Sequence, residues 1–336
     1  MAEGEDVLQF LDLEVRNGQT DIAVIQLPYE LTTSYGSGTA SGPKACVQAS
    51  AQVELYDPLF GDDLPGDLVL STPSPWIGTA GTLRGQLDEM VDFAKQYTDG
   101  SLFPLFLGGE HGILPPILEA LKSHPSLTGD LSKLTVVQID AHADLRSELD
   151  GEIFSHACAA SRSIDMGIGR LMQVGIRAFS KEEFECIQTN EHITTFFARD
   201  TQHPCTGAQH WNAWIDMLQE IDGPVHLTID IDGLDGSLVP STGTPVPGGL
   251  QFWQAVETIE ALFSNPHAEV ISADVNEIVP QGNSPLTEFT AAMLATKIIG
   301  GHCYSRKMGF WKTNPQNVNF DKKATQSTFF STWTEG

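Results

Sequence analysis

The amino-acid sequence predicts an α/β protein built around a mainly parallel sheet. Short apolar segments of the kind that form strands alternate with longer segments of helical periodicity. Most of the apolar segments are continuous, which suits strands that are buried on both faces of a parallel sheet. Because crossovers between parallel strands are right-handed and usually helical, we expect helices on both faces of this sheet.

Six segments carry the strand pattern, and they are residues 21–29, 102–109, 134–140, 171–178, 225–232 and 269–278. Six further segments carry helical patterns, and they are 85–97, 115–124, 181–188, 210–221, 253–264 and 285–299. No Pro/Gly-rich linker divides the chain, so a single domain over residues 1–336 is expected. Residues 1–20 are then an N-terminal extension. The polar tail 312–336 is expected to pack on the surface or to contact a neighbouring subunit.

Composition and charge exclude several classes of function. The chain has 44 acidic and 18 basic residues and a net charge of −26. A protein that binds nucleic acid or an anionic membrane needs basic residues to neutralise phosphates, so neither partner is expected. A small cation would be attracted, although an acidic surface also simply favours solubility. The five cysteines form no C-x-x-C pair and the N-terminus has no signal-peptide pattern, so the cytoplasm is the expected compartment.

Polar residues directly follow four of the predicted strands. The four segments are GGEHG (108–112), DAHAD (140–144), DID (230–232) and DVNE (274–277). Open α/β sheets bind their ligands outside the carboxyl ends of the strands. Alone, each motif has a simpler interpretation, such as a helix cap or a solvated turn. Their shared position after buried strands predicts one site at one edge of the sheet.

The first three motifs contain the donors of a two-metal site. Residues two apart in an extended chain point to the same side, so these side chains can converge. Four carboxylates so close together would repel unless cations neutralise them, and two divalent ions would balance the charge. A donor set rich in oxygen, with imidazoles and no thiolate, favours Mn²⁺, with Ni²⁺ or another divalent ion as alternatives. The expected ligands are His111, Asp140, His142, Asp144, Asp230 and Asp232.

Such a site indicates a hydrolase. Metal ions lower the pKa of bound water towards neutrality and so supply a hydroxide nucleophile. The substrate then has an electrophilic carbon or phosphorus centre. Phosphate esters are an alternative, but the sequence has no Walker loop or basic cluster to hold a phosphate.

These motifs together resemble the ureohydrolase family, which includes arginase, agmatinase, guanidinobutyrase and formimidoylglutamase. GGEHG, IDAHADLR and TIDIDGLDGSLVPSTGTPVPGG resemble its three metal motifs, and the resemblance runs from about residue 21 to residue 300. It implies a three-layer α/β/α sandwich with a central, mainly parallel sheet of eight strands. It also implies assembly into a homo-oligomer, often a trimer or hexamer.

The resemblance further implies the catalytic residues. Glu277, in SADVNEIVP, would pair with a substrate guanidinium, and a carboxylate suits the fork of that planar cation. His156, in FSHACAA, would pass a proton to the leaving amine, and Asp144 would accept the proton of the hydroxide. Thr244 lies in the TGTPVPGG loop that lines the family's pocket. Here Ala157 follows His156 where the family has Gly, and Gly236 stands where the family usually has Pro.

The expected substrate is a small cationic guanidino compound, with agmatine favoured and urea and putrescine as products. The acidic residues of the loop 145–155, Glu148, Asp150 and Glu152, would suit a distal ammonium. Arg146 would either pair with one of these acids or meet a substrate carboxylate, which would favour guanidinobutyrate or a related guanidino acid. Arginase and guanidine hydrolase remain alternatives within the family. Outside it, the alternatives are a one-zinc deacetylase and an inactive metal-binding scaffold.

Overall fold

The computed structural model describes residues 8–312 and 327–334. Its centre is one eight-stranded sheet in which every neighbouring pair of strands is parallel. In spatial order the strands are β4 (Leu70–Ser71), β1 (Ile22–Leu27), β5 (Phe103–Gly108), β10 (Ala268–Asn276), β9 (Gly223–Asp230), β6 (Thr135–Ile139), β7 (Arg170–Ile176) and β8 (Ile193–Phe197). A separate hairpin pairs β2 (Tyr56–Asp57) with β3 (Asp62–Asp63).

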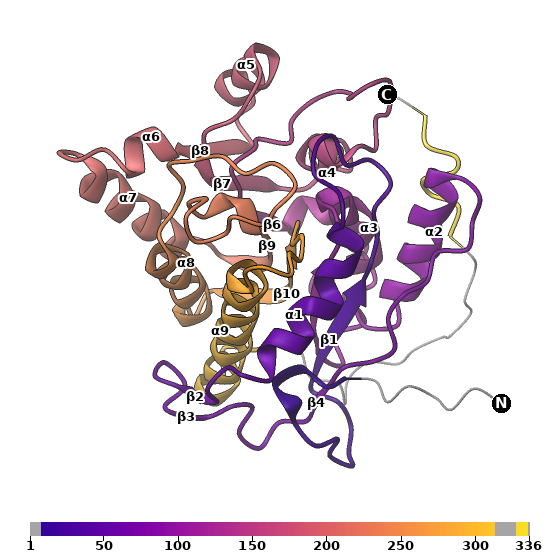
Figure 1. Cartoon of the computed structure of the whole chain (residues 1–336), viewed down its shortest axis with the longest axis vertical. Coiled ribbons are helices and arrows are strands. Elements are labelled where there is room, and N and C mark those ends of the chain that lie inside the picture. The colour runs from indigo at the N-terminus through magenta and orange to yellow at the C-terminus, as the bar shows by residue number, and fades with distance from the viewer. Residues whose placement is uncertain (1–7, 313–326, 335–336) are drawn as a thin grey trace.

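Helices cover both faces of the sheet, so the expected α/β/α sandwich is confirmed (Figure 1). One buried apolar cluster lies beneath α1 (Gly42–Ser50), α7 (Gly207–Gln219), α8 (Phe252–Ser264) and α9 (Leu286–Met308). The other lies beneath α2 (Leu83–Ala94), α3 (Leu114–Leu121) and α4 (Ala159–Asp165). The remaining helices are α5 (Lys181–Thr189) and α6 (Ala198–Thr201). The 3-10 turns of the described residues are η1 (Phe10–Asp12), η2 (Thr39–Ser41), η3 (His111–Ile113), η4 (Leu131–Lys133), η5 (His156–Cys158) and η6 (Ile231–Gly233).

The six strands predicted from the sequence occupy the six inner positions of the sheet, and the two unpredicted strands, β4 and β8, form its edges. The inner strands are almost entirely buried, which is why their sequences are continuously apolar. The edge strand β4 has two residues, and β8 (ITTFF) is mostly half-buried. An apolar pattern therefore could not identify either edge.

The end of the C-terminal tail packs on the surface of the molecule. The carboxylate of Asp88 in α2 accepts hydrogen bonds from the backbone N–H groups of Phe330 and Ser331. Phe330 is fully buried and its ring packs edge-on against that of Phe154. Residues 327–334 thus contact α2 and Phe154, while 313–326 and 335–336 lie outside the described residues. Among the described residues, no helix is long and apolar enough to cross a membrane.

Candidate metal centre

The strand order brings the four polar motifs together. β5, β10, β9 and β6 are the four consecutive central strands, and GGEHG, DVNE, DID and DAHAD end or follow them. All four strands run in the same direction, so their carboxyl ends lie at one edge of the sheet. The motifs therefore meet as predicted, above the centre of the sheet.

The six expected metal ligands form two clusters that share Asp140. In the first, His111 Nδ1 lies 3.1 Å from Asp140 Oδ2 and 2.9 Å from Asp144 Oδ2. Asp230 Oδ2 lies 3.8 Å from the same nitrogen. In the second, His142 Nδ1 lies 3.1 Å from Asp232 Oδ2 and 3.7 Å from Asp140 Oδ1. Since each oxygen of Asp140 faces a different cluster, this carboxylate would supply a donor to both clusters.

The carboxylates of this site repel one another unless protons or cations neutralise them. Burial and the charge of Asp140 raise the pKa of Asp144 to about 7. Burial and the carboxylates of Asp232 and Asp140 raise the pKa of Asp230 well above its usual value. Burial lowers the pKa of His142, but the charge of Asp232 and the hydrogen bond to Asp140 outweigh it, and the pKa is about 11. Without metal these groups hold protons, and divalent cations would displace them.

His111 is held in the tautomer that a metal ligand needs. Thr228 Oγ1 donates to Asp274 Oδ1 at 2.8 Å, so it accepts the proton of His111 Nε2, also at 2.8 Å. In the neutral ring Nδ1 therefore keeps the lone pair. It faces the carboxylates of Asp140 and Asp144, which raise the pKa of His111 well above its usual value despite its burial, so Nδ1 holds a proton when no cation is bound. A buried nitrogen aimed at three carboxylates fits a divalent cation in place of that proton, and ligating histidines commonly use their second nitrogen in this way.

The chain that supports His111 continues deeper. Asp274 Oδ2 lies 2.7 Å from His226 Nε2, and His226 Nδ1 lies 2.7 Å from Ser272 Oγ. Asn276 Nδ2 donates to Asp274 Oδ1. Asp274 was expected among the strand-end residues of the site, but it lies inside β10 and acts beneath the donors. The sequence did contain a signal for this supporting chain, the alternation of His226, Thr228 and Asp230 along β9. Residues two apart in a strand share a face, so these three polar side chains point to the same side.

Glu277 is fixed in a strained position beside the centre. Its backbone has a φ of 63°, in the left-handed region that costs a non-glycine residue about 1–3 kcal/mol. Its N–H donates to the carbonyl of Gly109 at 2.7 Å, and its Oε1 accepts from the N–H of His111 at 2.8 Å. A Cβ on Gly109 would stand 2.0 Å from the carbonyl oxygen of Tyr29. Only glycine therefore allows the backbone at position 109 to lie this close to Tyr29. The carbonyl of Gly109 in turn holds Glu277.

A cavity of about 250 Å³ opens beside the donors. Its lining brings together residues that sequence analysis assigned to metal binding, catalysis and substrate recognition: His142, Asp144, Arg146, His156, Asp230, Thr244 and Glu277. Burial raises the pKa of Glu277 well above its usual value, and the charges of Glu110 and Asp232 add to that effect. Burial lowers the pKa of His156. Thr244 Oγ1 lies 3.4 Å from Asp232 Oδ2.

Comparison with known proteins identifies the family. A model of the arginase family matches residues 20–300. The chain belongs to the arginase family. It is 34% identical to an N(1)-aminopropylagmatine ureohydrolase from Synechocystis sp., with 87% of this chain and 93% of that protein covered. It is 30% identical to an agmatinase from Pyrococcus horikoshii, with 83% and 91% covered. A crystal structure of a hypothetical agmatinase from Burkholderia thailandensis matches with a TM-score of 0.75 at 27% identity, covering 90% of this chain and 92% of that one.

Membership of the arginase family makes the protein a hydrolase of the ureohydrolase class. It also confirms the resemblance and the fold expected from it. The family generally uses a binuclear metal centre, and the two clusters that share Asp140 supply donors for one.

Within this arginase-family site, the surroundings of Arg146 differ from expectation. Its Nε lies 3.8 Å from Glu183 Oε2, and among the described residues the acids of the loop 145–155 form no ion pair with it. Glu183 is buried, and backbone hydrogen bonds from Leu145 and Ser180 to its two oxygens offset the cost of that burial. The predicted pairing with Glu148, Asp150 or Glu152 was therefore wrong. The missed signal was the capping box that Ser180 forms with Glu183 at the start of α5.

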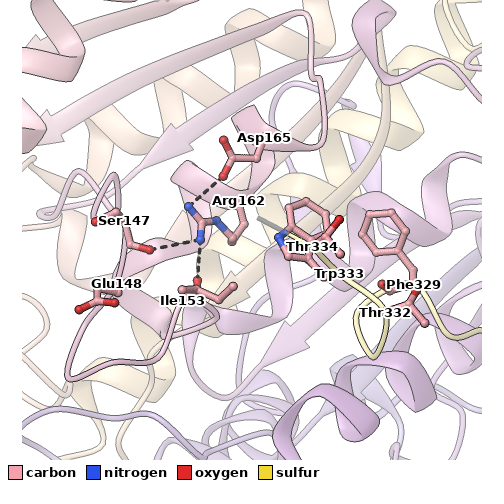
Figure 2. Close-up of a pocket in the computed structure, with 9 residues that line it drawn as sticks. All are labelled: Ser147, Glu148, Ile153, Arg162, Asp165, Phe329, Thr332, Trp333 and Thr334. Carbon is pink, nitrogen blue, oxygen red and sulfur yellow. Dashed lines mark hydrogen bonds and ion pairs between the residues drawn. The ribbon is translucent and has the colours of Figure 1, made fainter. Parts of the chain in front are cut away.

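The acidic side chains of the loop 145–155 are not among the residues that line the cavity. Among the described residues, Arg146 and Leu149 are the loop's members in the lining, whereas Glu148 lines a separate surface pocket. Figure 2 shows that pocket, in which Arg162 lies between the two ends of the loop. Arg162 Nη1 donates to the carbonyls of Ser147 and Ile153 at 3.2 and 3.3 Å. The loop is thus held closed at its base by a buried guanidinium.

Proposed function

We propose that the protein hydrolyses agmatine to putrescine and urea with the help of two divalent cations, Mn²⁺ in the first place. The observation that carries this proposal is the pair of donor clusters that share Asp140 beside a cavity lined by Glu277 and His156. The names of the curated relatives, agmatinase and N(1)-aminopropylagmatine ureohydrolase, support a basic guanidino substrate.

The six donors would hold the cations, and bound cations would supply a hydroxide by lowering the pKa of water. His111 and Asp144 belong to one cluster, His142 and Asp232 to the other, and Asp140 to both. Asp144 Oδ2 faces His111 Nδ1, which leaves Oδ1 to take a proton from the nucleophile.

Glu277 would bind the guanidinium. A buried carboxylate that lacks a cation has a raised pKa, as Glu277 has, and a planar guanidinium placed against it would favour the charged form. The carboxylate would therefore hold the guanidinium carbon in place beside the donors. His156 lines the same cavity and would protonate the departing nitrogen. Burial lowers its pKa, so its protonated form is a stronger acid than an exposed imidazolium.

The far end of the substrate would lie near Arg146, Leu149 and Phe179, which line the cavity. The side chain of Arg146 is 41% exposed, and the carboxylate of Glu183 partly neutralises it. This observation favours a second candidate, a guanidino acid whose carboxylate meets Arg146. The names of the relatives favour a substrate with an amine tail instead, and agmatine is the smaller of the two that they mention.

A panel of substrates tests the proposal. Protein loaded with Mn²⁺ would be assayed for urea release from agmatine, N(1)-aminopropylagmatine, arginine, guanidinobutyrate and guanidine. We expect the highest kcat/KM with agmatine. A preference for guanidinobutyrate that Arg146→Ala abolishes would establish the guanidino-acid activity instead. Urea release from none of the substrates, in protein shown to contain metal, would refute the ureohydrolase proposal.

We also propose that the protein works as a homo-oligomer, a trimer or hexamer, in the cytoplasm. The family resemblance supports the assembly, and the acidic composition supports a cation as the partner rather than nucleic acid or a membrane. Sedimentation at several protein concentrations would test the assembly, and a monomer throughout would refute it.

A further inference from the structure

His156 is held by a residue from a distant loop. The hydroxyl of Thr32, in the loop that follows β1, accepts a hydrogen bond from the backbone N–H of His156 at 2.9 Å. The same hydroxyl lies 3.3 Å from Nδ1 of the imidazole ring. It donates its own proton to Glu110 Oε1 at 2.8 Å. Thr32 therefore joins the imidazole to a carboxylate that lies beside the candidate metal centre.

The directions of these hydrogen bonds fix the tautomer of His156. A hydroxyl has one proton to donate and two lone pairs that accept. While Glu110 is ionised it takes the proton of Thr32, so the contact with Nδ1 is made only if Nδ1 carries a proton and donates it. Nε2 then keeps the lone pair of the neutral ring. This nitrogen lies 3.4 Å from Ser34 Oγ, a residue of the cavity lining.

We propose that Glu110 and Thr32 are positioning residues for His156, which keep its proton on Nδ1 and leave Nε2 to exchange protons with the substrate. This inference rests on the proposed function, because it assigns His156 the proton transfer to the leaving nitrogen. Neither residue touches the substrate, and both act through the imidazole.

Glu110 is well suited to this role because it is itself immobilised. It is fully buried, and its Oε2 accepts hydrogen bonds from the backbone N–H groups of Leu31 and Thr32 at 3.2 and 2.8 Å. One carboxylate thus holds the backbone and the side chain of the same threonine. The nearest competing partner for Nδ1 is Ser155 Oγ, at 3.5 Å. The contact with Thr32 is shorter and anchored, so it determines the orientation of the ring.

The proton inventory of the step then balances. In the protonated form of His156, both ring nitrogens carry a proton. As the bond between the guanidinium carbon and the leaving nitrogen breaks, its electron pair stays on that nitrogen, which takes the proton from Nε2. The ring becomes neutral with its remaining proton on Nδ1, where Thr32 accepts it. No rotation of the ring is needed between the charged and neutral forms.

Two variants, one that keeps the shape of Thr32 and one that keeps its hydroxyl, separate this role from a purely structural one. Thr32→Val removes the hydroxyl, and Thr32→Ser restores it. Thr39→Val is the matched control, because Thr39 follows in the same loop, is fully buried and has a hydroxyl without a partner among the described residues. We expect kcat for agmatine to fall roughly tenfold to a hundredfold in Thr32→Val, less than the whole contribution of a general acid. KM and bound metal should change little, and Thr32→Ser should recover most of the loss.

A measurement that does not need activity decides the tautomer. Long-range ¹H–¹⁵N spectra of histidine-labelled protein, loaded with diamagnetic Zn²⁺, distinguish a proton on Nδ1 from one on Nε2. The His156 signals are assigned by their loss in His156→Gln. We expect Nδ1–H in the wild type and in Thr32→Ser, and a change in Thr32→Val. Nε2–H in the wild type would overturn the inference even if every variant folded poorly, as would unchanged spectra and kcat in Thr32→Val. If the tautomer is as expected but no guanidino compound is hydrolysed, the proposed function fails and the hydrogen-bonded relay stands.

Discussion

Replacing Thr228 by valine would remove one hydroxyl from beneath the candidate metal centre and leave the shape of the side chain almost unchanged. The hydroxyl accepts from His111 Nε2 and donates to Asp274 Oδ1, both at 2.8 Å. His111, Thr228 and Asp274 are all buried, so water cannot replace the missing group. The substitution therefore leaves the N–H of a metal ligand unpaired and frees the ring to change its tautomer.

The expected magnitudes follow from this geometry. A buried donor without a partner costs about 1–3 kcal/mol, and this is the expected loss in the free energy of unfolding of the metal-free protein. Asp274 loses the hydrogen bond from Thr228 but keeps its hydrogen bonds with His226 and Asn276. Removing a partner of a ligating histidine typically weakens metal binding about 10- to 100-fold. That range corresponds to roughly 1.4–2.8 kcal/mol of binding free energy.

The two effects are measured separately. Urea-induced unfolding of the metal-free protein gives the stability change, and competition with a chelator gives the affinity for Mn²⁺. Thr228→Ser is the matched control, because it keeps the hydroxyl and should retain most of the affinity. Metal affinity in Thr228→Val equal to that of the wild type would refute the reasoning that this hydroxyl sets the ligating tautomer of His111.

Three further outcomes are expected. Asp140→Ala or Asp230→Ala should remove bound metal and urea release together, and full activity in either variant would contradict the two-metal reading. His156→Ala should lower kcat at least about a hundredfold while metal content stays constant, and loss of metal would exclude its role in proton transfer. Because the pKa of Asp144 rises from 3.8 to about 7 in the folded protein, the contribution of Asp144 to the stability of the metal-free form should fall as pH rises from about 4 to 7. Thermal unfolding should then show a larger Mn²⁺-induced gain in Tm at pH 8 than at pH 5, and the reverse order would contradict this.

The inner strands of the sheet could be predicted because strands that are buried on both faces have a recognisable apolar sequence pattern. β1, β5, β6, β7, β9 and β10 are rich in apolar residues, most of them as continuous runs, and each was expected within a few residues of its observed bounds. The edges β4 and β8 have no such pattern, because a strand with one neighbour need not be apolar throughout. The helix α1, GPKACVQAS, was also missed, since glycine, proline and serine obscure its short apolar face.

The candidate site was predictable where a residue follows its own strand and not where a contact joins distant segments. His111, Asp140 and Asp230 belong to motifs at strand ends, and the parallel sheet alone brings them together. Thr32 lies 78 positions before Glu110 and 124 before His156. No local pattern in the loop after β1 reveals that its threonine would reach either. Glu183 was missed for the same reason, because its hydrogen bond from the Leu145 N–H joins the helix α5 to the loop that follows β6.

The site combines several features that destabilise the metal-free fold, and they lie where the chemistry is expected. Asp144 and Glu277 both have left-handed backbones, with φ of 53° and 63°, at a cost of about 1–3 kcal/mol each. Their carboxyls are buried and have raised pKa values, so ionising them near neutral pH is unfavourable without a cation. Cations that bind only the folded state would offset this by about 2.7 kcal/mol at a concentration of 100 times Kd. Metal binding and folding are therefore coupled through the same carboxylates, so a substitution that makes the metal-free protein more stable at these positions is expected to weaken the site.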